Sequence, residues 1–143
     1  METVRICNVG SLPTKKAPEK NFTGNVFISD YFECEKPSKL VVATVTFIPG
    51  ARTPWKTNPL GQTLIVISGI GWAQCEGEEI IEIRAGDIIR FPPGKRHWDG
   101  ATHNHTMTNI AIHETKNGNA VTFLEKVTDE EYLKGKSLVR KSV

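Results

Sequence analysis

A series of short apolar segments, divided by glycine and proline from about residue 22 to residue 115, constrains the fold most. The segment at 39–50 alternates apolar and polar residues, and the segment at 62–69 is a continuous β-branched run. Similar segments follow at 87–94 and 106–114, and no amphipathic helical period crosses them. Alternation indicates a half-buried strand, whereas a continuous run indicates burial on both faces. Many short strands with turn residues between them predict an all-β sandwich or closed barrel.

Turns are expected where glycine and acidic residues cluster between these segments. Gly-Ile-Gly-Trp at 69–72 predicts one reversal of the chain, and Glu-Gly-Glu-Glu at 76–79 predicts another. The chain of 143 residues is expected to be one domain, 1–143, with its barrel at about 22–115.

A short helix is expected near the C-terminus. Thr128 precedes Glu131 by three residues, which is the pattern of a capping box. We expect the helix over about 128–134, followed by a basic tail at 135–143.

Composition narrows the classes of partner. The formal net charge is +2, and the basic residues are scattered, so no nucleic-acid footprint is expected. No apolar run suits a signal peptide or a membrane span, which predicts a cytoplasmic protein without a membrane partner. Cys7, Cys34 and Cys75 are odd in number and widely spaced, as expected for reduced thiols.

Two sets of residues stand at the spacings of a two-part motif. The first is Gly50, Lys56, Asn58, Gln62 and Gly69, and the second, about 17 residues later, is Gly86, Pro92, Gly94 and His97. These spacings resemble the cupin motifs G-x5-H-x-H-x3,4-E-x6-G and G-x5-P-x-G-x2-H-x3-N, with Ala101 at the final asparagine position. The resemblance implies a cupin fold, a jelly-roll-like antiparallel β-barrel.

A narrower resemblance covers residues 20–133. The stretches 49–74, 93–101 and 107–114 are similar to small single-domain cupins associated with carboxymuconolactone decarboxylases, a group that includes metal-dependent hydroxynitrile lyases. In that group Gln62 is the usual replacement for the acidic ligand, and His97 is the fourth ligand. The resemblance therefore implies a divalent metal, such as Mn, Fe, Ni or Zn, at these positions.

The chain departs from that ligand set at two positions. Lys56 and Asn58 stand where the motif has histidines, which leaves Gln62 and His97 as the only metal ligands if a metal binds. One imidazole and one or two amides are a poor set for a first-row transition metal. We therefore predict a degenerate metal site and no tightly bound cofactor.

Lys56 has three interpretations. Its ammonium could enter the barrel and stabilise a developing carboxylate, enolate or cyanide charge. A buried, deprotonated amine could instead form a Schiff base. In the third interpretation the side chain reaches solvent and has no chemical role.

The strand at 106–114 offers further candidates. Asn109 and His113 share one face by strand alternation, and in the resembling group this face lines the active site. His113 is a candidate for proton transfer or a structural histidine, and Asp99 is a candidate to orient Lys56 or His97 or a salt bridge without a catalytic role. His103 and His105 lie in a polar turn and are expected at the surface. Trp55, Trp72 and Trp98 are expected to pack in the barrel or to lie at its rim.

The leading hypothesis is a lyase or decarboxylase-like enzyme for a small hydroxy or keto acid, a lactone or a cyanohydrin-like compound. Lys56 would supply positive charge, His113 would transfer a proton, and the substrate would be positioned by Asn58, Gln62, His97, Asp99 and Asn109. The alternatives are a ligand-binding or structural cupin without catalysis and, third, a metal-dependent lyase or dioxygenase with atypical ligands. A homodimer or homotetramer is expected, through exchanged or paired edge strands.

Overall fold

The computed structural model describes residues 3–138 and is mostly antiparallel β-structure. The strands are β1 (Lys15–Lys16), β2 (Val26–Glu33), β3 (Leu40–Phe47), β4 (Lys56–Thr57), β5 (Gln62–Cys75), β6 (Ile81–Arg84), β7 (Ile88–Phe91), β8 (His97–Ala101), β9 (Met107–Glu114) and β10 (Thr122–Phe123). The helix α1 (Asp129–Leu133) and the 3-10 segment η1 (Lys134–Ser137) follow. The predicted all-β antiparallel fold with a short C-terminal helix is confirmed.

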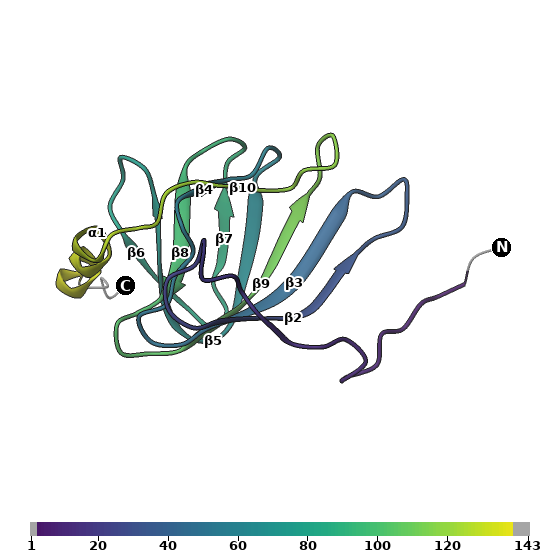
Figure 1. Cartoon of the computed structure of the whole chain (residues 1–143), viewed down its shortest axis with the longest axis horizontal. Coiled ribbons are helices and arrows are strands. Elements are labelled where there is room, and N and C mark those ends of the chain that lie inside the picture. Colours follow the sequence, from purple (N-terminus) through teal and green to yellow (C-terminus); the bar gives the residue numbers. More distant parts are fainter. Residues whose placement is uncertain (1–2, 139–143) are drawn as a thin grey trace.

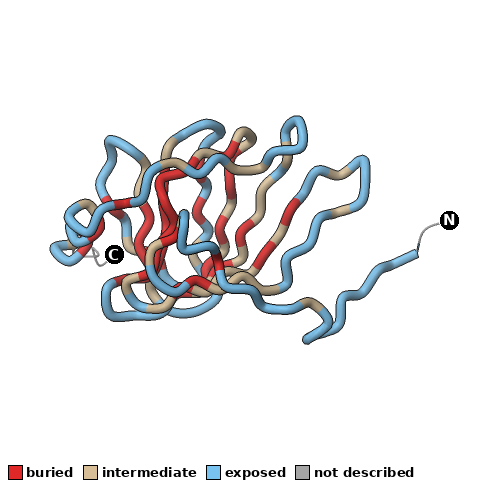
Figure 2. Tube along the Cα trace, viewed as in Figure 1, coloured by how far each residue is buried: buried red, intermediate tan, exposed pale blue. Residues whose placement is uncertain are grey.

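The strands form one sheet that curls into a half-barrel (Figure 1). Their order is β1-β2-β3-β9-β5-β8-β4-β10, and β6 and β7 also pair with β5. The buried residues lie mainly along the central strands and toward the end of the molecule that carries α1 (Figure 2). The half-barrel thereby holds side chains of β3, β5, β8 and β9 around one interior.

The predicted reversal at 69–72 is wrong, because β5 runs through it as one strand. The first part of β5 pairs with β9 and β7, and the second part pairs with β6 and β8, with a register shift between Val66 and Ser68. Gly69 has φ +78, and a Cβ there would collide with the carbonyl oxygen of Thr106. Gly69 and Gly71 permit a bend in β5 and a close approach of neighbouring backbone. A turn uses glycine for the same reasons, which is why the pattern predicts a reversal.

An apolar cluster lies under α1. Its buried residues are Trp55, Trp72, Ile80, Trp98, Val127 and Tyr132, so the tryptophans pack as predicted. The hydroxyl of Tyr132 donates to the carbonyl oxygen of Ala101 at 2.6 Å, which fixes α1 to the end of β8.

The capping box that was predicted to open α1 is confirmed. The Glu131 backbone donates to Thr128 Oγ1, while the Thr128 backbone donates to the Glu131 carboxylate. The predicted basic tail begins inside η1, and its residues 139–143 lie outside the described residues. No helix within residues 3–138 is long and apolar enough to cross a membrane.

Candidate functional site

A cavity of about 310 Å³ opens inside the half-barrel. Its volume lies at the lower end of the range for small-molecule sites. Apolar side chains make up most of its wall, including Ile28, Val41, Val45, Phe47, Leu64 and Phe123. The polar groups Lys56, Gln62, Asp99, Asn109 and His113 also line it. The cavity therefore suits a small, mainly apolar ligand that carries a few polar atoms.

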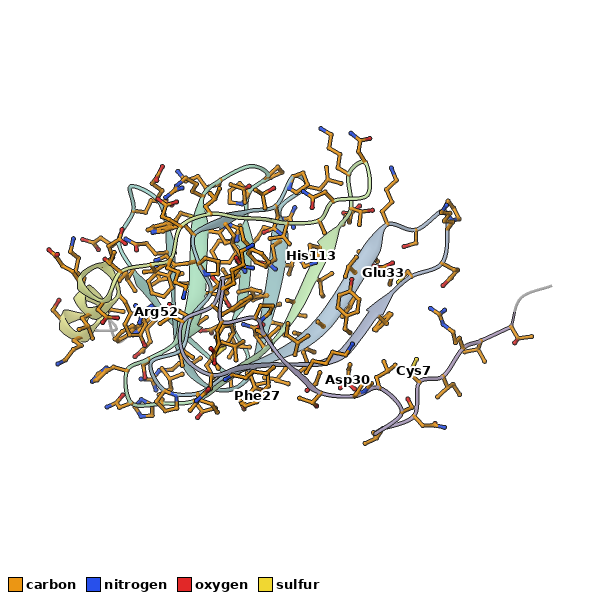
Figure 3. The ribbon with its side chains drawn as sticks, in the orientation of Figure 1. Cys7, Phe27, Asp30, Glu33, Arg52 and His113 are labelled. Carbon is orange, nitrogen blue, oxygen red and sulfur yellow. The ribbon has the colours of Figure 1, made fainter. Side chains whose placement is uncertain are left out.

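Four strands bring the polar groups together. Lys56 of β4 is the register partner of His97 of β8, and Gln62 of β5 is the register partner of His113 of β9. His113 on β9 and Glu33 on β2 are labelled in Figure 3, and both line the cavity from strands that flank β3. The face expected from the alternation of Asn109 and His113 is the face that lines the cavity.

Lys56 and Asp99 form a buried ion pair. The Nζ atom of Lys56 lies 3.0 Å from Asp99 Oδ1, and the two side chains are 7% and 2% exposed. The interpretation in which Lys56 reaches solvent is therefore wrong. Asn109 Nδ2 donates to the other carboxylate oxygen of Asp99 at 3.1 Å. One positive and one negative charge, fixed by an amide, stand at the wall of the cavity.

Asn109 also carries a buried acceptor without a partner. Its side-chain oxygen, Oδ1, has no hydrogen-bond partner within residues 3–138. An unsatisfied buried polar atom costs about 1–3 kcal/mol, so this oxygen is a local destabilisation beside the Lys56–Asp99 pair.

Two histidines flank the Gln62 amide. Nε2 of His97 lies 3.4 Å from Gln62 Oε1, and Nδ1 of His113 lies 3.1 Å from Gln62 Nε2. Burial, reinforced by the positive charge of Lys56, lowers the pKa of His97 to about 4. The same two causes lower the pKa of His113 to about 4. Both imidazoles are consequently neutral at pH 7.

Asn58 and His97 are fully buried and are not among the residues that line the cavity. Asn58 turns its Nδ2 to the carbonyl oxygen of Ala120 at 2.8 Å. The ring of His97 stacks on Phe91 with centroids 3.9 Å apart. Of the residues predicted to position a substrate, these two can therefore act on a ligand in this cavity only through their neighbours.

The other two histidines lie away from the cavity. His103 and His105 are exposed in the turn between β8 and β9, as predicted, and His105 Nδ1 lies 3.1 Å from Thr102 Oγ1. The sequence reasoning missed the apolar wall. The signal was present, because Val41, Val45 and Phe47 are separated by even numbers of residues and so face the same side of β3.

The family model described as Cupin domain matches residues 43–113. The (R)-mandelonitrile lyase of Granulicella tundricola is 50% identical over 129 residues, which cover 90% of this chain and 98% of that relative. A crystal structure of a cupin-like protein from Thermotoga maritima superposes with a TM-score of 0.78 at 35% identity, covering 83% of this chain and 90% of that one. The polyketide cyclase RemF from Streptomyces resistomycificus shares the fold, with a TM-score of 0.71 at 12% identity over 94% of each chain. The paired motifs, the curled sheet and these relatives together place the chain in the cupin family.

Proposed function

We propose that this chain is a lyase for cyanohydrin-like compounds, which it splits into a carbonyl compound and hydrogen cyanide. The observation that carries the proposal is the buried Lys56–Asp99 ion pair at the wall of an apolar cavity. The 50% identity to a relative named (R)-mandelonitrile lyase supports the choice of substrate class. The apolar wall would receive the organic substituent, and the polar groups would receive the hydroxyl and nitrile.

The residues at the motif positions do not fit a divalent metal. Lys56, Asn58, Gln62 and His97 offer an ammonium, two amides and one imidazole, and no group of three His, Cys, Asp or Glu lies together within the described chain. The ammonium of Lys56 would repel a cation, and first-row metals favour imidazole and carboxylate ligands that this set lacks. We therefore propose that the metal site is degenerate and that the Lys56 cation provides the positive charge.

The proposed reaction balances with the groups in the cavity. The Nε2 atom of His113 takes the substrate hydroxyl proton, and the carbon–carbon bond to the nitrile breaks as the carbonyl forms. The electron pair leaves with cyanide, whose charge is stabilised by the Lys56 ammonium. The proton on His113 then passes to cyanide, which leaves as hydrogen cyanide. The neutral form of His113 is the form that can accept the first proton.

The apolar surroundings favour this division of roles. A fixed cation interacts more strongly with a developing anion where water is excluded and the effective dielectric constant is low. Asp99 holds Lys56 at 3.0 Å, and Asn109 holds Asp99 at 3.1 Å, so the cation does not need to reorganise during the reaction.

A ligand-binding cupin without catalysis is the second candidate. Two observations favour it: Asp99 already compensates the Lys56 charge, and a pKa of about 4 makes His113 a weak base. The same cavity could then bind a small hydroxy acid or hydroxynitrile without breaking a bond.

The test is to incubate the protein with mandelonitrile and measure benzaldehyde and cyanide release. Lys56→Met should abolish most of the release, whereas Lys39→Met, at an exposed lysine outside the cavity, should leave it unchanged. Saturable binding of mandelonitrile without product from the wild-type chain would select the second candidate.

A further inference from the structure

The Gln62 amide lies between His97 and His113. The positions of the protons on these two rings decide whether a ligand in the cavity contacts a hydrogen-bond donor or an acceptor. His97 lies behind the cavity wall, His113 lines the cavity, and Gln62 contacts one ring with each end of its amide. The number of hydrogen bonds that each group can donate or accept determines where the protons lie, starting from His97.

The first hydrogen bond of this series joins His97 to the backbone, because its Nδ1 lies 2.8 Å from the carbonyl oxygen of Lys95. A carbonyl oxygen only accepts, so Nδ1 must carry the proton. The ring is fully buried, and burial favours its neutral form, which holds one proton. Its Nε2 is consequently an acceptor.

The Gln62 amide must therefore donate a hydrogen bond from its NH2 group to Nε2 of His97. The structure places Oε1 beside His97 Nε2 at 3.4 Å, so two acceptors face each other at a long distance. The two ends of an amide are assigned from their hydrogen bonds, and a half-turn that exchanges oxygen and nitrogen removes this conflict. Gln62 then donates to His97 and presents its oxygen to His113.

The tautomer of His113 follows from the same matching of donors to acceptors. An amide oxygen beside its Nδ1, at the 3.1 Å contact, requires a proton on Nδ1. Burial favours the neutral form of half-buried His113, whose Nε2 is then unprotonated and has no hydrogen-bond partner among residues 3–138. A ligand in the cavity therefore meets a proton acceptor there.

We infer that Gln62 is a positioning residue whose amide, oriented by His97, holds His113 in the Nδ1–H tautomer with Nε2 unprotonated toward ligand. The cavity then presents this acceptor beside the Lys56 cation. This set selects ligands with a hydroxyl donor next to an anionic or nitrile acceptor, such as 2-hydroxynitriles. The role in proton transfer rests on the proposed function, whereas the tautomer does not.

Long-range proton–nitrogen NMR of the uniformly ¹⁵N-labelled chain at pH 7.5 tests the tautomers directly. Each of the four histidines is assigned by its single His→Gln variant, and exposed His103 and His105 serve as internal references. His97 and His113 should both appear as Nδ1–H. An Nε2–H signal for His113, or a rapid average of both tautomers, would overturn the inference.

Two Gln62 variants test the cause. Gln62→Met removes the amide, so His113 should lose its exclusive Nδ1–H form while His97, held by Lys95, should keep it. Gln62→Glu retains an acceptor for His113 and should retain the tautomer, and it serves if Gln62→Met fails to fold. An unchanged His113 in folded Gln62→Met, or a switch to Nε2–H in Gln62→Glu, would contradict the positioning role.

Turnover of mandelonitrile separates the two proposals. A kcat that falls at least about tenfold in Gln62→Met, with KM changed less than about threefold and partial recovery in Gln62→Glu, supports positioning. An unchanged kcat in Gln62→Met overturns it. The expected tautomers without turnover in any variant support the positioning inference and overturn the lyase proposal.

Discussion

The ammonium of Lys56 lies 3.0 Å from the carboxylate of Asp99, and both side chains are almost completely buried. Their strands β4 and β8 are neighbours in the sheet, where Lys56 pairs with His97 two residues before Asp99. Two opposite charges taken out of water are stable only while each has the other as partner. This dependence makes the pair sensitive to any change that removes one of its two charges.

Asp99→Asn should destabilise the fold by about 3–5 kcal/mol, because it leaves the Lys56 charge buried without a counter-charge. Urea unfolding of wild type, Asp99→Asn, Lys56→Met and the double variant measures the effect as a double-mutant cycle. The double variant should recover most of the loss. Equal and additive losses of less than about 1 kcal/mol would mean that the pair is not energetically coupled.

Gly69→Ala should destabilise the fold by more than Gly77→Ala, although both glycines have φ near +80. A left-handed backbone costs an alanine about 1–2 kcal/mol at either position. At Gly69 the added Cβ also collides with the carbonyl oxygen of Thr106, whereas nothing lies within 4 Å at Gly77. Thermal unfolding of both variants isolates the collision, and equal losses would show that the Thr106 backbone, just before β9, moves aside without cost.

The sequence predicted β3, β7 and β9 because an apolar strand pattern is local, and the paired motifs identified the fold, but β2 and β8 were not predicted as strands. It did not predict that β5 passes through Gly69, since the same glycine pattern permits either a turn or a close approach to another strand. The Gln62–His113 contact was also out of reach. It depends on the register of β5 against β9, and register is set by packing between distant segments.

Stability should fall as the pH is lowered from about 6.5 to about 4. The folded pKa of His97 and His113 is about 4, below the ordinary 6.5, so the unfolded chain binds more protons in this window. Their stabilisation is complete above pH 6.5 and is lost progressively toward pH 4. For fully buried His97 we expect a loss of roughly 2–4 kcal/mol, and a smaller loss for half-buried His113.

Urea midpoints measured from pH 7.5 to pH 4 check this dependence. His113→Gln should flatten the pH profile because it removes one of the two groups. The matched control His103→Gln, at an exposed histidine, should keep the wild-type slope. A wild-type profile that stays level over the window would contradict the buried, neutral state of both rings.

The N-terminal segment should mediate self-association. It extends away from the half-barrel beyond the edge strands β1 and β2 (Figure 1), and Val4, Ile6 and Val9 on it are 84%, 74% and 104% exposed. Exposed apolar residues beside a sheet edge favour pairing with a second copy. Light scattering should give a dimer or tetramer, and the triple change of these residues to aspartate should reduce its mass, whereas a wild-type monomer would contradict the prediction.

Divalent metals should neither copurify with the wild-type chain in stoichiometric amount nor raise its melting temperature. Lys56 brings a positive charge to the position of a ligand, and Asn58 directs its amide nitrogen to Ala120. Elemental analysis of protein purified without chelator, followed by titration with Mn, Fe, Ni and Zn, measures both quantities.

The paired change Lys56→His/Asn58→His provides the contrast for the metal measurement. It restores two imidazoles two residues apart, beside Gln62 and His97, and these side chains suit a divalent metal. Nickel or zinc should therefore stabilise this variant, by about 2.7 kcal/mol at one hundred times its dissociation constant. If the wild-type chain already binds one metal with a similar stabilisation, the prediction of a degenerate site is wrong and metal-dependent chemistry becomes the better proposal. Metal binding would then require the Lys56–Asp99 pair to open.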